Sequence, residues 1–350
     1  MVNPVAIGGR NIGPDLPCLV IAEAGVNHNG SLDMALRLVD SASEAGADVV
    51  KFQTFKAEQV VSPVAPKADY QVQTTGGSES QLEMVKKLEL PPEAFRQIER
   101  RCVERGIVFM STPFDVESVD LLQELGVVAF KIGSGELTNL SFLSYVASKG
   151  KPLILSTGMS TLQEVATAVE AVRAAGNHDL VILHCVSNYP AAPSSVNLRV
   201  MKTLEEEFGV PVGYSDHTEG IKIPLAAVAL GACVIEKHFT LNRNLPGPDH
   251  RASLEPGELE AMVRGIRAVQ SALGDGRKRP AAEELSTAAV ARRSLVAACD
   301  LQAGAVLTQD MIAIRRPGTG LPPSALSQLV GRRLRQDITA GALFTTEMLA

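Results

Sequence analysis

The sequence predicts an α/β protein built on a (β/α)8 barrel and followed by a small β-rich module. Three observations support this prediction. Eight short apolar runs recur between residues 19 and 240, each followed by a polar and glycine-rich cluster and a segment with helical periodicity. A cluster of glycine, basic and proline residues interrupts the chain at 274–280. Beyond this cluster, a stretch of ten residues occurs twice in similar form.

The eight apolar runs are the expected barrel strands. Helix-compatible segments such as 31–45 and 161–175 follow them, as β/α units require. The main alternative is a doubly wound open sheet, whose dinucleotide-binding form carries GxGxxG after the first strand. The sequence there is EAGVNHNG, which lacks that spacing. We therefore expect strands at 19–22, 49–52, 107–110, 127–132, 153–155, 180–183, 210–213 and 233–235.

The end of the chain reads as a separate folding unit. A helical stretch at 256–273 is followed by GDGRKRP, which is typical of a linker. We place the barrel domain at 1–275, the linker at 276–285 and the second domain at 286–350. Within that domain AGAVLTQDMI, which begins at Ala303, is echoed 37 residues later by AGALFTTEML. This duplication predicts a small β-rich module with pseudo-symmetry.

The composition of the 350 residues excludes several classes of protein. Hydrophobic residues make up 45% and charged residues 21%, which excludes intrinsic disorder. A net charge of −6 without a basic block argues against nucleic acid as a partner. No apolar run approaches the roughly 18 residues of a membrane span, and no signal-peptide pattern is present, so we expect no membrane contact and a cytoplasmic location. Five scattered cysteines without a CxxC pair argue against disulfides and a cysteine zinc site.

Histidines at the ends of the expected strands suggest a metal site. His217 and His238 are separated by about one helix and one strand, so they should emerge from adjacent strands on the same rim of the barrel. Strand alternation places Glu236 on the same face as His238 and leaves Lys237 pointing away. Two imidazoles with open remaining positions suit a divalent ion that polarises a carbonyl. The alternative is a pair of hydrogen-bonded rim histidines without metal.

Two lysines at the same rim suggest an anion site. Lys51 and Lys131 are the next-to-last residues of two of the expected strands, and Lys131 precedes a glycine-rich turn that contains Ser134. Glycines allow backbone amides to approach phosphate oxygens, while the hydroxyls of Thr112 and Ser156 add neutral donors. The alternative is that each lysine forms a structural ion pair with a glutamate.

Three carboxylates could complete such a site. Glu23 and Glu136 are the glutamates that could pair with the lysines, and they could equally accept protons or bind sugar hydroxyls. Asp249 lies in the loop PGPDH and could also accept hydrogen bonds from hydroxyls. Carboxylates beside lysines fit the recognition of a polyol.

At these loops the sequence resembles the sialic acid synthase family, which condenses phosphoenolpyruvate with a sugar to make N-acetylneuraminate and related nonulosonic acids. The resemblance covers nearly the whole chain. It rests on eight motifs in order, namely IAEAGVNHNG, KFQTF, STPFD, KIGSGE, LSTGM, GYSDHT, EKHFT and GPDH. The end of the chain is similar to the antifreeze-like (SAF) domain of these synthases, and RRPGTGL resembles a segment that reaches the partner's site.

The resemblance implies roles for particular residues. His217 and His238 would hold a divalent ion, most often Mn²⁺, with Mg²⁺ or Co²⁺ as other options. Arg316 would reach the partner's site in a domain-swapped homodimer. The catalytic set would be Glu23, Glu136, His217 and His238. Phosphoenolpyruvate would bind near Lys51, Thr112, Lys131, Ser134, Ser156 and Ser215, and the sugar near Gln53, Glu136, Tyr189 and Asp249, with Ser187 and Asn188 from the loop HCVSNYP as further substrate contacts.

The implied activity is that of a metal-dependent transferase. Phosphoenolpyruvate would condense with N-acetylmannosamine, or a closely related N-acylated mannose-like sugar, and phosphate would leave with C–O cleavage. The motif SDHT is similar to the bacterial branch that uses an unphosphorylated sugar. One alternative is a metal-dependent pyruvate aldolase on the same barrel, which would release no phosphate. Another is a non-catalytic glycan-binding protein, against which the polar residues on all eight loops argue.

Overall fold

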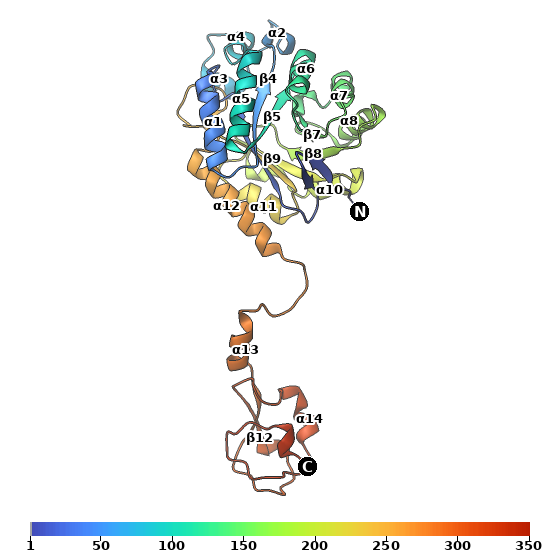
Figure 1. The fold of residues 1–350 in the computed structure, drawn as a ribbon, viewed down its shortest axis with the longest axis vertical. Coiled ribbons are helices and arrows are strands. Elements are labelled where there is room, and N and C mark those ends of the chain that lie inside the picture. The colour runs from blue at the N-terminus through green and yellow to red at the C-terminus, as the bar shows by residue number, and fades with distance from the viewer. Residues whose placement is uncertain (1) are drawn as a thin grey trace. The chain divides into compact units, whose positions relative to one another are not determined.

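The computed structural model describes residues 2–350, which form two compact units, 2–274 and 275–350 (Figure 1). The sequence-based division placed a linker at 276–285, and helix α13 (Glu284–Ala291) begins within its last residues. None of the helices in residues 2–350 is both long enough and apolar enough to cross a membrane.

The first unit is a barrel of eight parallel strands. Their order is β5-β4-β3-β10-β9-β8-β7-β6, with each strand hydrogen-bonded to its neighbour in this order. Only β5 and β6, the two ends of the order, have no ladder between them within the described residues, so the barrel is nearly closed. The predicted (β/α)8 barrel is confirmed. Its strands are β3 (Leu19–Gly25), β4 (Val49–Thr54), β5 (Val108–Pro113), β6 (Phe130–Ile132), β7 (Leu153–Ser156), β8 (Leu180–Cys185), β9 (Val212–Asp216) and β10 (Val234–His238).

Several strands run further toward their carboxyl ends than their apolar runs predict. The run at 210–213 stops before Ser215 and Asp216, yet both belong to β9. The run at 233–235 likewise stops before His238, the last residue of β10. These polar residues are buried at the carboxyl end of the barrel, so a prediction based on hydrophobicity ends each strand too early.

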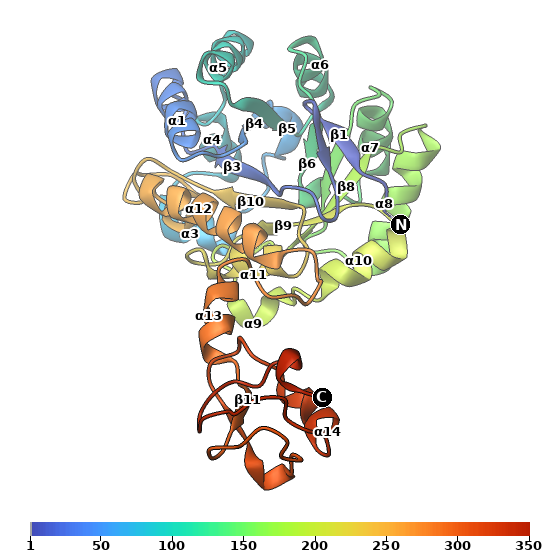
Figure 2. The ribbon, with the colours of Figure 1, turned by 60° about the horizontal axis from the view of Figure 1, so that its bottom comes forward.

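Helices cover the outside of the barrel, and each lies with its apolar side against the strands. The helix pair α11 and α12 lies side by side in Figures 1 and 2. Gly265 allows this close approach, since a Cβ atom there would lie 2.9 Å from a methyl carbon of Leu225. The covering helices are α1 (Leu32–Glu44), α5 (Pro92–Arg105), α6 (Val116–Glu124), α7 (Leu140–Ala147), α8 (Leu162–Ala174), α10 (Val200–Phe208), α11 (Lys222–Ala229) and α12 (Pro256–Leu273).

The amino-terminal end of the barrel is closed by a hairpin that the apolar runs did not predict. Strands β1 (Val5–Ile7) and β2 (Arg10–Ile12) pair antiparallel. Val5, Ile7 and Ile12 are buried against inward-facing side chains of the barrel strands. This apolar plug leaves only the carboxyl end of the barrel open for chemistry.

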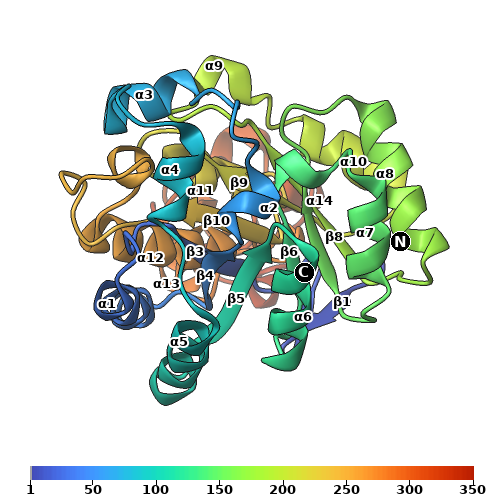
Figure 3. The same ribbon diagram turned by 90° about the horizontal axis from the view of Figure 1, so that it is seen from above.

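Short helices lie at that carboxyl end. Between β4 and α5 the chain forms α2 (Ala57–Val60), α3 (Asp69–Thr75) and α4 (Gln81–Lys86), which face the viewer in Figure 3. Further short elements are η1 (Ser134–Glu136), α9 (Pro193–Val196) and η2 (His250–Ala252). The ring of Tyr70, on α3, lies 5.1 Å from that of Tyr189, so α3 contacts the loop that follows β8.

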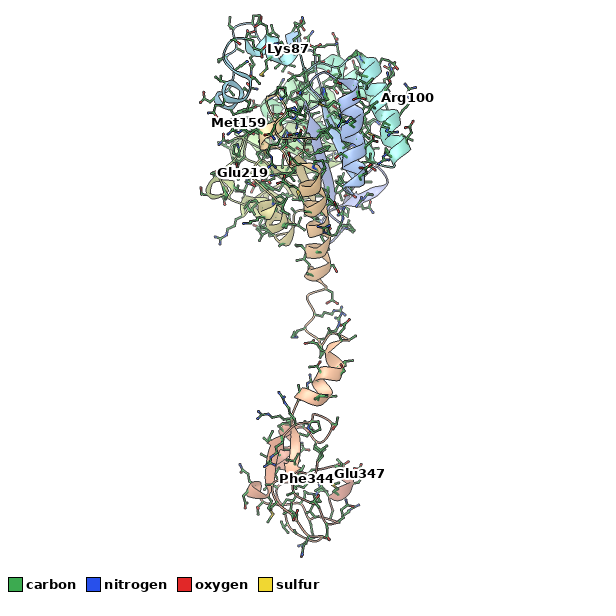
Figure 4. The ribbon with its side chains drawn as sticks, turned by 90° about the vertical axis from the view of Figure 1, so that its left-hand side faces the viewer. Lys87, Arg100, Met159, Glu219, Phe344 and Glu347 are labelled. Atoms are coloured by element: carbon green, nitrogen blue, oxygen red, sulfur yellow. The ribbon has the colours of Figure 1, made fainter. Side chains whose placement is uncertain are left out.

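The second unit is small and has its own apolar core. Phe344, labelled in Figure 4, is fully buried there, whereas Glu347 lies at the surface. Antiparallel strands β11 (Ser294–Ala297) and β12 (Ile312–Arg315) form its sheet. Its other elements are α13, η3 (Gln309–Met311), η4 (Pro323–Ala325), α14 (Leu326–Leu329) and η5 (Thr346–Met348).

The predicted duplication appears in this unit as paired hydrogen bonds. Leu301 and Ile338, which are 37 residues apart, exchange backbone hydrogen bonds of 2.8 Å in both directions. The Asp337 carboxylate accepts from the backbone N–H of Ala303 at 2.7 Å, and the Asp300 carboxylate accepts from that of Ala340 at 2.7 Å. These two hydrogen bonds correspond to each other, because both their donors and their acceptors are 37 residues apart in the sequence. The two halves of the domain are therefore related by an internal pseudo-twofold axis.

Candidate active site

Most of the predicted site residues line one cavity at the carboxyl end of the barrel. It has a volume of about 340 Å³. Strand alternation accounts for its composition, since inward-facing residues two apart, such as Glu236 and His238, share a face. Predicted residues that line it are Glu23, Lys51, Gln53, Thr112, Lys131, Ser134, Ser156, Ser187, Tyr189, Ser215, His217 and His238.

Four predicted residues do not line this cavity. Glu136 is held outside it, because its carboxylate accepts from the Asn139 amide at 2.9 Å within the turn around η1. Asn188 is exposed, although its neighbours on both sides line the cavity. Asp249 is buried in an adjoining second cavity. Arg316 lies in the other unit, just after β12, and is exposed.

The two lysines form a buried ionic network inside the cavity. The Lys51 ammonium lies 2.8 Å from the Glu23 carboxylate and donates to the Thr112 hydroxyl at 2.8 Å. Glu236 lies between the two lysines, 3.7 Å from Lys51 and 3.5 Å from Lys131. Lysine–glutamate pairing, which the sequence left open as an alternative to an anion site, is thus present. It involves Glu23 and Glu236, and not Glu136.

The two glutamates are placed in different electrostatic environments. Burial raises the pKa of Glu23 above its usual value, even though Lys51 opposes the shift. Burial acts on Glu236 in the same direction, but Lys131 and Lys51 outweigh it and hold the pKa of Glu236 below its usual value. Glu236 is therefore ionised at neutral pH, while Glu23 can exchange a proton there. With Glu23 protonated, two lysines face one ionised carboxylate, and the surplus positive charge suits an anion.

Neutral donors lie beside this charge. The backbone N–H of Gly158 donates to the Ser134 hydroxyl at 2.9 Å. A Cβ atom at Gly158 would lie 2.2 Å from the Ser187 hydroxyl, so a larger residue here would displace this side chain from the cavity. The Ser156 hydroxyl is buried and has no hydrogen-bond partner in the part of the chain that the structure describes. Its free hydroxyl and the lysines are suited to binding phosphate or carboxylate oxygens.

His217 and His238 lie together at the same cavity, with ring centroids 5.4 Å apart. Nδ1 of His217 lies 2.7 Å from the Val186 carbonyl, to which it donates, so Nε2 carries the free lone pair. Nδ1 of His238 is buried without a partner among the described residues. Burial, reinforced by His217, lowers the pKa of His238 well below its usual value, so its imidazole is neutral. The Tyr189 ring lies against both histidines, 4.1 Å from His217 and 5.6 Å from His238.

These two imidazoles fit one part of a metal site. Imidazole nitrogens are donors that a divalent transition metal prefers, and the ring of His217 is oriented by a backbone carbonyl. Residues 2–350 contain no group of three or more His, Cys, Asp or Glu side chains arranged to hold a metal ion. A bound ion would therefore keep open positions for water or substrate, as a catalytic site requires.

A second buried ion pair lies outside the cavity and holds the histidine-bearing strands together. Lys237 and Asp216 are 2.6 Å apart and almost fully buried. Asp216 also accepts from the Thr218 N–H at 3.0 Å, the Thr218 hydroxyl at 3.1 Å and the Tyr214 hydroxyl at 2.9 Å. Lys237 also donates to the Thr218 carbonyl. Because Asp216 precedes His217 and Lys237 precedes His238, this network fixes the backbone at both histidines.

Three cavity residues with ionisable side chains, namely Tyr70, Cys185 and Glu236, were not among the predicted site residues. Glu236 shares a face with His238, which the alternation indicated, but its position between the lysines depends on strands far away in sequence. Cys185 ends β8, and its thiol lies 3.7 Å from Nδ1 of His217. Tyr70 comes from α3, in a segment without any recognisable motif.

Comparison with known proteins identifies the family. The NeuB family model matches residues 38–278, and the SAF domain model matches residues 292–350. The chain is 49% identical to N,N'-diacetyllegionaminic acid synthase of Legionella pneumophila, over 96% of this chain and 95% of that protein. It is 38% identical to human N-acetylneuraminate-9-phosphate synthase, over 93% of this chain and 91% of that protein. The crystal structure of N-acetylneuraminic acid synthetase from Leptospira borgpetersenii, in complex with citrate, aligns with a TM-score of 0.72 and 36% identity, over 82% of this chain and 95% of that one. Together with the barrel, the cavity and the SAF domain, these matches confirm the resemblance seen in the motifs and show that the chain belongs to the NeuB family.

Proposed function

We propose that this chain condenses phosphoenolpyruvate with an N-acylated mannose-like sugar to give a nonulosonic acid and phosphate. The observation that carries the proposal is the juxtaposition of two buried lysines with two adjacent histidines in one cavity. The lysines suit the charge of phosphoenolpyruvate, and the histidines lie where a carbonyl of the second substrate could be activated.

The residues of the cavity have separate roles in this reaction. Lys51, Lys131 and Ser156 bind the phosphate and carboxylate oxygens of phosphoenolpyruvate. Its C3 forms a bond to the aldehyde carbon of the open-chain sugar, water adds at C2, and phosphate leaves as the C2–O bond breaks. Glu23, with its raised pKa, is protonated when phosphoenolpyruvate binds, gives this proton to the aldehyde oxygen as C3 attacks, and then accepts the proton that the attacking water releases. Glu236 favours the charged form of both lysines and holds them in place.

His217 and His238 would hold a divalent ion, for which Mn²⁺ is our first choice and Mg²⁺ or Co²⁺ are alternatives. When bound, the ion would supply electrophilic activation of the sugar aldehyde. The Tyr189 ring limits the space beside both imidazoles and thereby orients them.

The names of the relatives support a nonulosonic acid as product. Identity is higher to the diacetyllegionaminic acid synthase, at 49%, than to the N-acetylneuraminate-9-phosphate synthase, at 38%. This difference favours an unphosphorylated acceptor sugar. All five cysteines are free thiols, which is consistent with the cytoplasmic location that we propose.

We also propose a domain-swapped homodimer in which Arg316 serves the partner's site. Two observations support it. Met159 lines the cavity yet is 73% exposed, which fits a rim that another chain covers (Figure 4). Residues 275–350 carry ten basic and seven acidic side chains, which leaves 23 basic and 32 acidic in residues 1–274. The opposite net charges of the two units favour their association.

A phosphate-release assay tests the proposed reaction. The purified chain is incubated with Mn²⁺, phosphoenolpyruvate and an acceptor sugar, and phosphate is measured together with the new acid by mass spectrometry. We expect one phosphate per nonulosonic acid, and phosphoenolpyruvate labelled in its bridging oxygen should pass the label to phosphate. Turnover of free pyruvate without phosphate would establish the aldolase instead. A chain that transforms no acceptor, with or without phosphoenolpyruvate, would overturn the proposal.

A further inference from the structure

A second cavity of about 220 Å³ adjoins the catalytic one. The two cavities share the side chains of Gln53, Tyr70, Phe114, Tyr189 and His238. A sugar whose aldehyde lies at the histidines would therefore extend its remaining carbons toward this second cavity. None of the roles proposed above uses the residues at its far end.

The far end of the second cavity is apolar. Val26, Phe55 and Leu88 are buried together, with Val85 and Phe114 packed against them. Met84, on α4, is also buried and lines the cavity. The Phe55 and Phe114 rings meet edge to face at 6.3 Å, which fixes the position of this wall. Such a surface gains free energy when it buries methyl or methylene groups.

The polar residues at this cavity carry no positive charge. Its described lining includes neither lysine nor arginine, and the carboxylate of Asp249 is the acidic group there. Lysines on the neighbouring segment are engaged elsewhere, because Lys86 pairs with Glu58 and Lys87 pairs with Glu79. The amides of Gln71 and Gln81 lie 3.4 Å apart and offer donors and acceptors for another amide. A phosphate placed here would face the Asp249 carboxylate without a lysine or arginine to compensate its charge.

We propose that this second cavity is the specificity subsite for the end of the acceptor sugar remote from its aldehyde, and that it selects an uncharged, deoxygenated, N-acylated end. Met84 and Leu88 contact the methyl group or acyl chain, while Gln71 and Gln81 bind the amide. The preferred acceptor class is then a diacetamido-trideoxyhexose, ahead of N-acetylmannosamine and far ahead of its 6-phosphate. This inference rests on the proposed synthase activity.

The test compares kcat/KM for these three acceptors at saturating phosphoenolpyruvate. One buried methyl group in an apolar pocket changes kcat/KM by about 10- to 200-fold, so we expect the trideoxy sugar to exceed N-acetylmannosamine by that factor. We expect no measurable turnover of the 6-phosphate. Equal values for all three acceptors would overturn the subsite while leaving the synthase activity intact. A chain that releases phosphate with none of them would overturn the proposed function instead.

Two cavity variants, one at Met84 on α4 and one at Leu88 just after it, test which residues determine the selectivity for the acceptor. Met84→Lys should lower kcat/KM for the trideoxy sugar by about 10- to 200-fold and produce measurable turnover of the 6-phosphate. Lys86→Met, the reverse exchange at an exposed position of the same helix, is the matched control and should leave the acceptor ratios unchanged. Leu88→Ala should enlarge the subsite, so that an acceptor with a butanoyl group in place of acetyl gains relative to the parent sugar. If the ratios of kcat/KM between acceptors stay at the wild-type values in both cavity variants, the assignment is refuted. Misfolding would instead lower kcat/KM for all acceptors by the same factor.

Discussion

Breaking the buried pair between Asp216 and Lys237 should destabilise the barrel far more than breaking an exposed ion pair. Both side chains are almost fully buried, and their charged atoms are 2.6 Å apart. Removing one partner from such a pair typically costs about 3 to 5 kcal/mol, because the other charge stays buried without compensation. Lys237→Met leaves Asp216 with three hydrogen-bond donors, so the loss in the free energy of unfolding should be about 3 kcal/mol. Asp216→Asn leaves the ammonium of Lys237 facing only neutral acceptors and should cost more.

The assay is urea unfolding followed by far-UV circular dichroism, which reports mainly on the barrel helices. The double variant Asp216→Asn with Lys237→Met carries no unpaired charge, so it should recover most of the loss, with a coupling free energy of about 2 kcal/mol or more. Glu260→Gln is the control, since it breaks the exposed pair with Arg264 on α12 and should cost less than about 1 kcal/mol. If the free energy of unfolding of each single variant lies within about 0.5 kcal/mol of the wild-type value, the assigned role of the pair is refuted.

Four further predictions concern the site. His217→Ala and His238→Ala should each abolish turnover and weaken Mn²⁺ binding while the circular dichroism spectrum is retained; normal metal affinity in either variant would remove it from the ligand set. Lys131→Met should raise the KM for phosphoenolpyruvate by roughly 10- to 150-fold and the KM for sugar much less, as initial-rate kinetics would show; an equal rise in both would indicate a different role. Mixing inactive Arg316→Ala and His238→Ala chains should restore up to about half of the sites if each dimer site takes Arg316 from the partner, and heterodimers without activity would contradict the swap. Burial raises the pKa of Asp249 to about 6, so the folded protein binds a proton at Asp249 more tightly than the unfolded chain does. The free energy of unfolding of Asp249→Asn should therefore equal that of the wild type below about pH 4 and exceed it by up to about 3 kcal/mol as the pH rises through 6. A difference in urea unfolding that does not change with pH would contradict this shift.

The repeated β/α pattern was enough to predict the barrel, because each strand begins as a buried apolar run that a helix follows. The ends of the strands were not predictable in the same way. Asp216 and His238 are polar but belong to strands, since closure of the barrel buries them. Helices as short as α4 and the three-residue strands of the β1–β2 hairpin give no periodic pattern long enough to recognise.

The motifs located most of the cavity residues, since the carboxyl ends of parallel strands meet at one rim. What they could not show is which groups touch across the barrel. Glu236 contacts Lys51 and Lys131 only because β10, β4 and β6 curve around a common centre. The same holds for Glu136, whose local turn directs its carboxylate to Asn139 although its motif lies at the rim.

The reciprocal bonds of the C-terminal unit mean that neither half of it is a complete folding unit. If residues 303–312 were detached from 340–349, the Asp300 and Asp337 carboxylates would each lose the backbone N–H that the opposite half supplies. Two copies of one half carry the same donors and acceptors as the natural pair, so they could meet across a true twofold axis. Duplication and fusion of a self-associating peptide would produce this unit in one step.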